Sequence, residues 1–206
     1  MGRTSDAREK ILVAAQSLIE MRGYSSLGVA EICKAADVPK GSFYYFFDSK
    51  EALALAVVDE HWVHQRADWA RVLGGEQTPL RRLKQLFEET EALQSAGQLS
   101  CGTVSGCMFG NLTLELSNQT EAVRARLQEV FDEQVGMVQA VIAEARERGE
   151  VTVADDEKAA RSIVAQLEGQ VLFAKLYNRT GGLGDLWANC LALLGAEEPR
   201  EVAAGV

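Results

Sequence analysis

The sequence of 206 residues contains no uninterrupted apolar run of about 18 residues, which is the length that a membrane-spanning helix requires. Its first ten residues, MGRTSDAREK, also lack the apolar core of a secretory signal peptide. We therefore expect a cytoplasmic protein that does not enter a membrane.

Cysteine and histidine are scarce, and their spacing does not indicate a metal site. The four cysteines have no CxxC spacing, so in a cytoplasm we expect reduced thiols and no disulfide framework. His61 and His64 are spaced as ligands on one helical face, but no further ligand set accompanies them. We expect no metal ion and no cofactor.

Sequence patterns of enzymes are missing as well. The glycine-rich stretch at residues 181–184 lacks the Lys-Ser/Thr of a phosphate-binding loop and has no strand before it. No Ser/His/Asp set or pair of carboxylates is recognisable. The protein is therefore predicted not to be an enzyme, with an all-helical enzyme as the remaining alternative.

Basic residues are too few for indiscriminate binding to nucleic acid. The chain has 21 Lys and Arg against 30 Asp and Glu, a net charge of −9. Residues 1–60 alone hold seven basic and nine acidic side chains. Any DNA binding must then depend on a few well-placed cations and on helix N-termini directed at phosphates.

What the sequence does have is helical periodicity along almost its whole length, without β-type alternation, so we predict an all-α fold. The first helix is expected to begin at an Asp6/Glu9 capping box and to end before Gly23. The residue ranges of the later long helices are predicted as 50–73, 80–93, 107–116, 120–149, 155–178 and 185–194, with a glycine-rich patch at 97–106 and a frayed tail after Gly195.

Residues 25–50 are predicted to form two short helices with a tight turn between them, followed by the start of a third helix. Ile32 and Cys33 recur at helical spacing with Val29 and Ala36, and the sequence Asp37-Val38-Pro39 then interrupts the helix. Aspartate tolerates left-handed backbone angles, which suits the turn. Two helices joined by a short turn form a helix-turn-helix, whose second helix enters the DNA major groove.

The run VPKGSFYYFFDSKEAL at residues 38–53 resembles the signature of the tetracycline-repressor-like (TetR) transcriptional regulators. The resemblance implies about nine helices: a three-helix DNA-binding domain at residues 1–50 and a helical effector and dimerisation domain at 51–206, linked by a helix at 51–73. It also implies a homodimeric repressor of a double-stranded operator. The glycines at 74 and 75 and the Thr78-Pro79 pair mark the composition boundary between the two parts.

The resemblance further implies that residues 155–178 and 185–194 pair with a second subunit. The first of these helices carries two apolar faces, which requires two partners. One face holds Ile163, Val164, Leu167 and Val171, and the other holds Leu172, Phe173, Leu176 and Tyr177. An ordinary buried helix would explain the same pattern.

The predicted DNA contacts cluster around the second short helix. Its start and exposed face supply Lys40, Gly41, Ser42 and Tyr45 for the groove and the nearby backbone. By resemblance, the Tyr44 hydroxyl and the Lys50 ammonium contact phosphate. Ser26 is predicted to cap the first short helix and to donate to phosphate, because Leu27 and Gly28 replace hydroxyl residues common in the family. Phe43 and Phe47 are predicted core residues, and Phe46 replaces a frequent histidine.

A second informative segment runs from Cys101 to Cys107. Together with Lys175 it resembles the electrophile- and oxidant-responsive members of the family, in which the cysteine matching Cys107 is the sensor. Cys107 follows a glycine at the start of a predicted helix, where the positive end of the helix dipole and a nearby lysine favour a thiolate. Two alternatives stay open: Cys107 is a core residue, or the effector is a small molecule bound without covalent chemistry.

Large apolar side chains of the body are the candidate walls of an effector cavity. The predicted set is Trp62, Trp69, Phe87, Met108, Phe109, Phe131 and Phe173. The same residues also suit an ordinary hydrophobic core.

Overall fold

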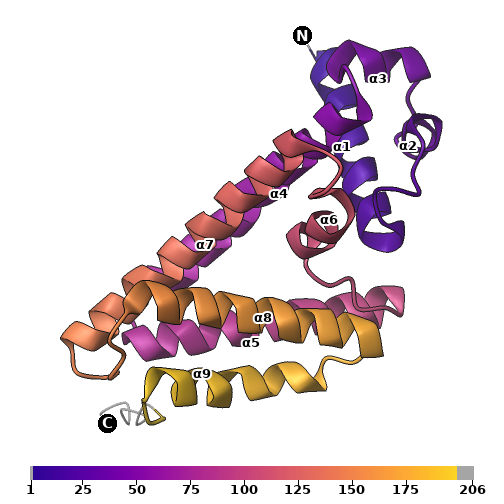
Figure 1. Ribbon diagram of the computed structural model, residues 1–206. Helices are drawn as coiled ribbons and strands as arrows, with labels where there is room; N and C mark the ends of the chain where they lie inside the picture. Colours follow the sequence, from indigo (N-terminus) through magenta and orange to yellow (C-terminus); the bar gives the residue numbers. More distant parts are fainter. Residues whose placement is uncertain (1, 199–206) are drawn as a thin grey trace. The chain divides into compact units, whose positions relative to one another are not determined.

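The structure is a computed structural model that describes residues 2–198, and side chains from residue 6 onward. Within these residues it consists of nine α-helices and one 3-10 helix, without a β-strand (Figure 1), which confirms the all-α prediction. The elements are α1 (Gly2–Arg22), α2 (Val29–Ala35), α3 (Lys40–Phe46), α4 (Lys50–Leu73), α5 (Pro79–Cys101), α6 (Met108–Leu116), α7 (Glu121–Glu147), α8 (Asp156–Tyr177), η1 (Gly181–Asp185) and α9 (Leu186–Leu194).

The chain divides into two compact units. The first comprises the residues up to Gln65 together with Ser105–Phe131, and the second comprises Arg66–Val104 and the residues from Asp132 onward. The first unit therefore holds α1, α2, α3, α6 and the first parts of α4 and α7. The second holds the remaining parts of α4 and α7 with α5, α8, η1 and α9. No described helix is both long enough and apolar enough to cross a membrane.

In the first unit, α1 packs on α2 and α3 through an apolar stripe. Ile11, Ala15 and Ile19 of this stripe are buried, as the helical spacing predicts. The helix ends at Gly23, whose positive φ of 78° is the left-handed conformation that stops a helix. The predicted capping box at Asp6 is wrong, because α1 already begins at Gly2. Asp6 instead accepts a 2.9 Å hydrogen bond from Lys10, an i,i+4 pair inside the helix.

The helix-turn-helix follows the sequence prediction closely. Ile32 and Cys33 of α2 are buried, and Asp37 turns the chain with a φ of 53°. Pro39 is the N-cap residue of α3. Ser49 caps α4, since its hydroxyl accepts the N–H of Ala52 at 3.0 Å.

In the second unit, α5 is longer than predicted. It runs through Gly97 to Cys101 and ends at Gly102, where φ is +77°. A glycine within a helix costs only about 1 kcal/mol relative to alanine, so packing outweighs it. Leu83, Leu86 and Phe87 are the buried residues that anchor this helix.

The second unit also contains α8 and α9, which pack on each other, and α9 packs on α5 as well (Figure 1). Asp155 caps α8 by accepting the N–H of Lys158 at 2.9 Å, as predicted. Asn178 ends the helix with a φ of 49°. The predicted frayed tail falls mainly on residues 199–206, which lie outside the described residues.

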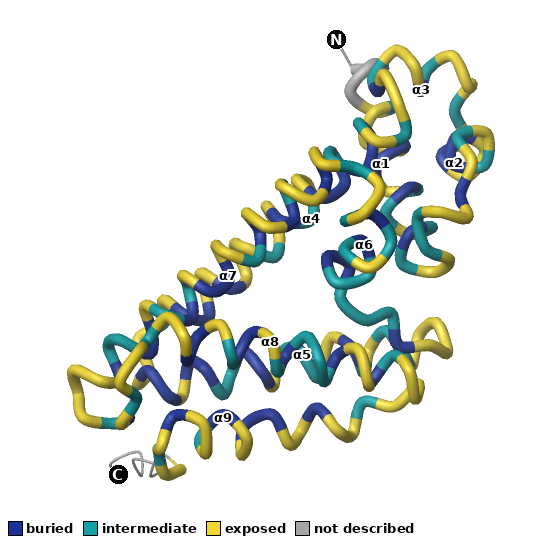
Figure 2. Tube along the Cα trace, in the orientation of Figure 1, coloured by how far each residue is buried: buried dark blue, intermediate teal, exposed yellow. Residues whose placement is uncertain are grey.

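Two faces of α8 differ in what covers them. The predicted inward face, Ile163, Val164, Leu167 and Val171, is buried. The second apolar face stays in solvent, with Leu172 49%, Phe173 50%, Leu176 67% and Tyr177 66% exposed. Figure 2 shows buried (dark blue) and exposed (yellow) residues alternating along α8.

Candidate functional site

The seven-residue helix α3 presents a polar and aromatic surface. Lys40 and Gly41 at its start are exposed, and Ser42 is half-buried. Tyr44 is 54% and Tyr45 74% exposed, which is unusual for such large side chains. The helix therefore displays the residue types that read base edges and hold phosphates.

Two phenylalanines hold this surface in place. Phe43 and Phe47 are 0% and 4% exposed, so both are core residues, as predicted. The Phe43 ring meets the Tyr44 ring edge-on, with the two ring centres 5.2 Å apart. Phe46 is half-buried and meets Tyr45 edge-on at 4.8 Å. Each exposed tyrosine thus rests against a phenylalanine, which limits the directions its ring can take.

Ser26 does not cap α2, contrary to the prediction. The N-cap residue of α2 is Gly28, and no side chain caps the helix. The Ser26 hydroxyl instead donates to the carbonyls of Arg22 and Gly23, at 3.0 and 3.2 Å. Carbonyls at the end of α1 have no partners within the helix, and a hydroxyl four residues on can reach them.

Lys50 has partners within the protein. Its ammonium donates a 2.7 Å hydrogen bond to the carbonyl of Tyr24 and lies 3.9 Å from the centre of the Tyr24 ring. Burial lowers the pKa of Lys50, and the Glu115 carboxylate acts in the opposite direction. Burial also raises the pKa of Tyr24, with smaller contributions from Glu51 and Glu115.

Glu115 of α6 holds the turn after α1, a role that the sequence did not predict. Its two carboxylate oxygens accept the backbone N–H groups of Tyr24 and Ser25, at 3.0 and 2.7 Å. Because Gly23 ends α1, the N–H groups of the residues that follow it need an acceptor outside the helix. Nothing in the sequence says that a carboxylate some 90 residues further along supplies their acceptor.

Cys107 lies one residue before α6, as its N-cap, and is half-buried. Its sulfur accepts the N–H of Gly110 at 3.4 Å. Lys175 is half-buried on α8. Cys107 belongs to the first unit and Lys175 to the second.

The other three thiols differ from one another in exposure. Cys101, the last residue of α5, is exposed, whereas Cys33 and Cys190 are buried. Burial raises the pKa of the Cys33 thiol, and it raises that of Cys190 to about 12. The two buried thiols are core residues.

The predicted cavity residues are divided between the two units. Trp62, Met108 and Phe109 of the first unit are buried, with Phe131 half-buried. The centres of the Trp62 and Phe109 rings are 6.0 Å apart and the rings meet edge-on, and the buried Trp62 Nε1–H has no hydrogen-bond partner among the residues that the structure describes. Trp69 and Phe87 are buried in the second unit, where Phe173 is half exposed.

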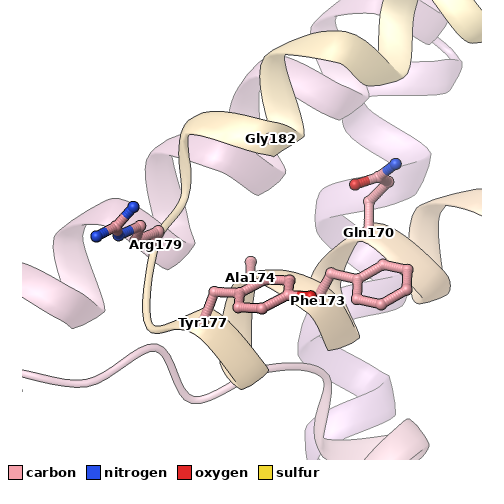
Figure 3. Close-up of a pocket in the computed structure, with 6 residues that line it drawn as sticks. All are labelled: Gln170, Phe173, Ala174, Tyr177, Arg179 and Gly182. Atoms are coloured by element: carbon pink, nitrogen blue, oxygen red, sulfur yellow. The ribbon is translucent and has the colours of Figure 1, made fainter.

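A pocket of about 670 Å³ opens on the exposed face of α8 (Figure 3). It is lined by Gln170, Phe173, Ala174, Tyr177, Arg179 and Gly182. The Phe173 and Tyr177 rings are stacked, with centres 6.1 Å apart. Of the predicted cavity residues, only Phe173 lines this pocket. Among the described residues, no three His, Cys, Asp or Glu side chains gather as metal ligands.

Two family models match the chain. Residues 11–57 match the bacterial regulatory proteins of the tetR family, and residues 79–188 match the tetracyclin repressor-like C-terminal domain. The chain belongs to the TetR family of transcriptional regulators. The exposed surface of α3 lies within the first match, and α6 and α8 lie within the second.

Curated TetR-family relatives cover most of the chain. The repressor NemR of Escherichia coli is 34% identical over 70% of this chain and 69% of its own. The repressor DhaR of a Mycobacterium species is 33% identical over 85% of both chains. The regulator AcuR of Cereibacter sphaeroides is 34% identical over 82% of this chain and 77% of its own. These relatives are transcriptional regulators, in agreement with the prediction that the chain is not an enzyme.

Solved structures agree with these relationships. The reduced form of E. coli NemR matches with a TM-score of 0.84 at 26% identity, over 94% of this chain and all of that one. A TetR regulator from Rhodobacter sphaeroides matches with a TM-score of 0.81 at 30% identity, over 89% of this chain and 96% of that one. The similarity to NemR thus extends from the sequence to the fold.

Proposed function

We propose that this protein is a homodimeric repressor that binds a pseudo-palindromic operator through α3 and releases it in response to a chemical signal. The observation that carries the proposal is the exposed polar and aromatic surface of α3, supported from behind by Phe43 and Phe47. A cation, a hydroxyl and two exposed tyrosines on one short helix are the groups that contact base edges and phosphates.

Each residue of this surface has a role in the proposal. The Tyr45 ring and the Ser42 hydroxyl face the groove, and Gly41 leaves room for the duplex to approach. The Lys40 ammonium binds a phosphate or a guanine edge, and the Tyr44 hydroxyl donates to a phosphate. Because the chain carries a net charge of −9, these few groups supply most of the favourable electrostatics.

Dimerisation is supported by the apolar face of α8. Leu172, Phe173, Leu176 and Tyr177 form a continuous exposed stripe, and the pocket of Figure 3 opens on it. We propose that α8 and α9 of a second copy cover this face. Because these side chains are already a third to a half buried, covering them contributes about 1 kcal/mol each, less than the roughly 1.5–3 kcal/mol for a fully exposed one.

The signal in our proposal is modification of Cys107 by an electrophile or oxidant. Its half-buried sulfur accepts the N–H of Gly110, so alkylation or oxidation removes an acceptor and adds bulk at the start of α6. The similarity to NemR, whose solved structure is described as the reduced form, supports a redox-responsive group in this protein, and we propose Cys107 for that group.

A non-covalent effector is the second candidate, and one observation favours it. The Trp62 Nε1–H is buried without an acceptor, beside the Phe109 ring. Such a donor costs about 1–3 kcal/mol until a partner accepts from it. A ligand with a hydrogen-bond acceptor and an apolar body would supply that partner.

DNA binding is tested with a duplex that the wild-type protein selects from a random pool. The variants Lys40→Ala and Tyr45→Ala should each weaken binding to this duplex about tenfold or more. Lys158→Ala, which removes an exposed lysine of α8, is the matched control and should leave affinity unchanged. If no duplex is enriched, or if all three variants bind like the wild type, α3 is not the interface.

The signal is tested with the same duplex. N-ethylmaleimide or hydrogen peroxide should release the wild-type protein, whereas Cys107→Ser should stay bound. Release of both proteins would eliminate Cys107 as the sensor. Screening for small molecules that quench Trp62 fluorescence and release the duplex then tests the second candidate.

A further inference from the structure

The turn after α1 is held by a carboxylate from α6. Gly23 turns the chain with a φ of 78°, and the next two backbone N–H groups, of Tyr24 and Ser25, donate to the two Glu115 oxygens at 3.0 and 2.7 Å. The Glu115 Oε1 atom would lie only 2.8 Å from a Cβ at position 23. Glycine at this position therefore permits both the turn and the close approach of the carboxylate.

The same turn is held from its other side by α4. Lys50, the first residue of α4, donates to the Tyr24 carbonyl at 2.7 Å and covers the Tyr24 ring at 3.9 Å. Two side chains of opposite charge thus hold one peptide segment. Glu115 accepts hydrogen bonds from the N–H groups of this segment, and Lys50 donates one to its carbonyl. Hydrogen bonds with a charged partner are about twice as strong as neutral ones.

The contacts of Glu115 and Lys50 matter because the turn that they hold connects α1 to the helix-turn-helix. It leads directly from α1 into α2 and the helix-turn-helix. On the other side, Glu115 lies eight residues after Cys107, or about 12 Å along a helix at 1.5 Å per residue. The short helix α6 therefore carries the candidate thiol at its beginning and the contact to the turn near its end.

We infer that Glu115 and Lys50 are positioning residues for operator binding, which hold the turn at Tyr24 and thereby fix the helix-turn-helix relative to α6 and α4. The inference rests on the proposed DNA binding by α3, and it adds a role for two residues outside that surface. A displacement of α6 reaches the helix-turn-helix through the Glu115 carboxylate. Lys50 acts within the protein and not as a phosphate ligand.

A first experiment needs no DNA. Amide hydrogen exchange at Tyr24 and Ser25 should be at least about tenfold faster in Glu115→Ala than in the wild type, because both N–H groups lose their acceptor. Glu121→Ala, which removes a surface glutamate paired with Arg124, is the matched control and should leave both amides unchanged. Equal exchange in the wild type and Glu115→Ala would overturn the contact.

A second experiment separates positioning from phosphate contact. On the duplex selected by the wild type, Glu115→Gln and Lys50→Gln should each weaken binding about tenfold, and the double variant should lose much less than the product of the two. The salt dependence of Lys50→Gln should match that of the wild type. Lys40→Gln, which removes a proposed phosphate contact, should reduce the slope of log K against log salt by about one.

The outcomes are distinguishable. A reduced salt slope in Lys50→Gln would make Lys50 a phosphate ligand, and full additivity of the two substitutions would disconnect it from Glu115. Either result overturns the inference while the proposed function stands. If the wild type selects no duplex, the proposed function fails, and the exchange experiment still decides whether Glu115 holds the turn.

Discussion

The sulfur of Cys107 accepts the backbone N–H of Gly110 at 3.4 Å, so a thiol stands where helices usually have a hydroxyl or carboxylate cap. Sulfur is a weak acceptor. The weak cap fits our proposal that a thiol stands at this position for its chemical reactivity.

A first prediction concerns this cap. Cys107→Ser should be at least as stable as the wild type, because the serine hydroxyl is a better acceptor for the Gly110 N–H. Cys107→Ala should be about 1 kcal/mol less stable than Cys107→Ser, the usual cost of a lost N-cap. Urea unfolding of the three proteins measures the difference. Equal stability of the serine and alanine variants would mean that the cap contributes nothing.

The four thiols should react in an order set by their exposure. With N-ethylmaleimide under native conditions we expect Cys101 and Cys107 to react, and Cys33 and Cys190 to remain unmodified. Burial raises the pKa of Cys190 to about 12, so almost no thiolate exists there near neutral pH. Peptide mass spectrometry after timed alkylation measures the order. Early modification of Cys190 would contradict its burial.

Acidification should destabilise the protein through His61. Burial lowers the pKa of this side chain below its usual value of 6.5, with a smaller effect from His64. Its ring meets the Phe109 ring of α6 and is hydrogen-bonded to Gln16 of α1 at 3.2 Å. Below about pH 6.5 the unfolded chain takes up a proton that the folded protein resists, so stability is present above that pH and falls as the pH drops.

The measurement is the free energy of unfolding at pH 7.5 and pH 5.5. The loss between the two should be smaller in His61→Gln, which keeps a polar side chain beside Gln16. His64→Gln is the control: His64 is exposed and makes only the smaller contribution to the lowered pKa of His61, so this variant should lose almost as much as the wild type. The same loss in all three proteins would show that other groups cause the acid sensitivity.

Replacing Gly23 should affect both stability and the Glu115 contact. Alanine at a φ of 78° costs about 1–2 kcal/mol, and its Cβ would displace the Glu115 carboxylate. Gly136→Ala is the control, because no neighbouring atom lies within 4 Å of its Cβ position and alanine favours a helix. Thermal unfolding should show opposite shifts for the two variants. A neutral Gly23→Ala would remove the need for glycine at this turn.

The exposed face of α8 should determine the oligomeric state. Phe173→Glu places a charge in the apolar stripe and should raise the dimer dissociation constant about a hundredfold or more. Leu99→Glu, at an 89% exposed position of α5, is the control for a surface charge. Sedimentation over a range of concentrations measures both. An unaffected Phe173→Glu dimer would place the subunit interface elsewhere.

Most helix ends were predictable because they depend on neighbouring residues. The glycine at 23, the aspartate at 37 and the aspartate cap at 155 all act where the sequence places them. The end of α5 was predicted wrongly because a local signal competed with packing. Gly97 did not stop α5, since buried residues on the same helix outweigh its propensity.

The exposed surface of α3 was easier to predict from the sequence than the residues of an effector cavity. The spacing of aromatic residues in α3 and at its C-cap separates the buried Phe43 and Phe47 from the exposed Tyr44 and Tyr45. The cavity residues were less predictable, because a large apolar side chain suits a core and a ligand pocket equally. The structure buries six of the seven wholly or in part and leaves Phe173 half exposed.

By itself, the sequence determined the all-helical fold, the helix-turn-helix and the family, since each follows from residues close together along the chain. Only the tertiary structure decided that Glu115 holds the Tyr24 and Ser25 amides and that Lys50 donates to the Tyr24 carbonyl. The physical reason is that an unpaired backbone N–H or carbonyl group forms a hydrogen bond with any suitable side chain that comes within about 3 Å. Which side chain reaches that distance depends on how the helices pack, and not on their order in the sequence.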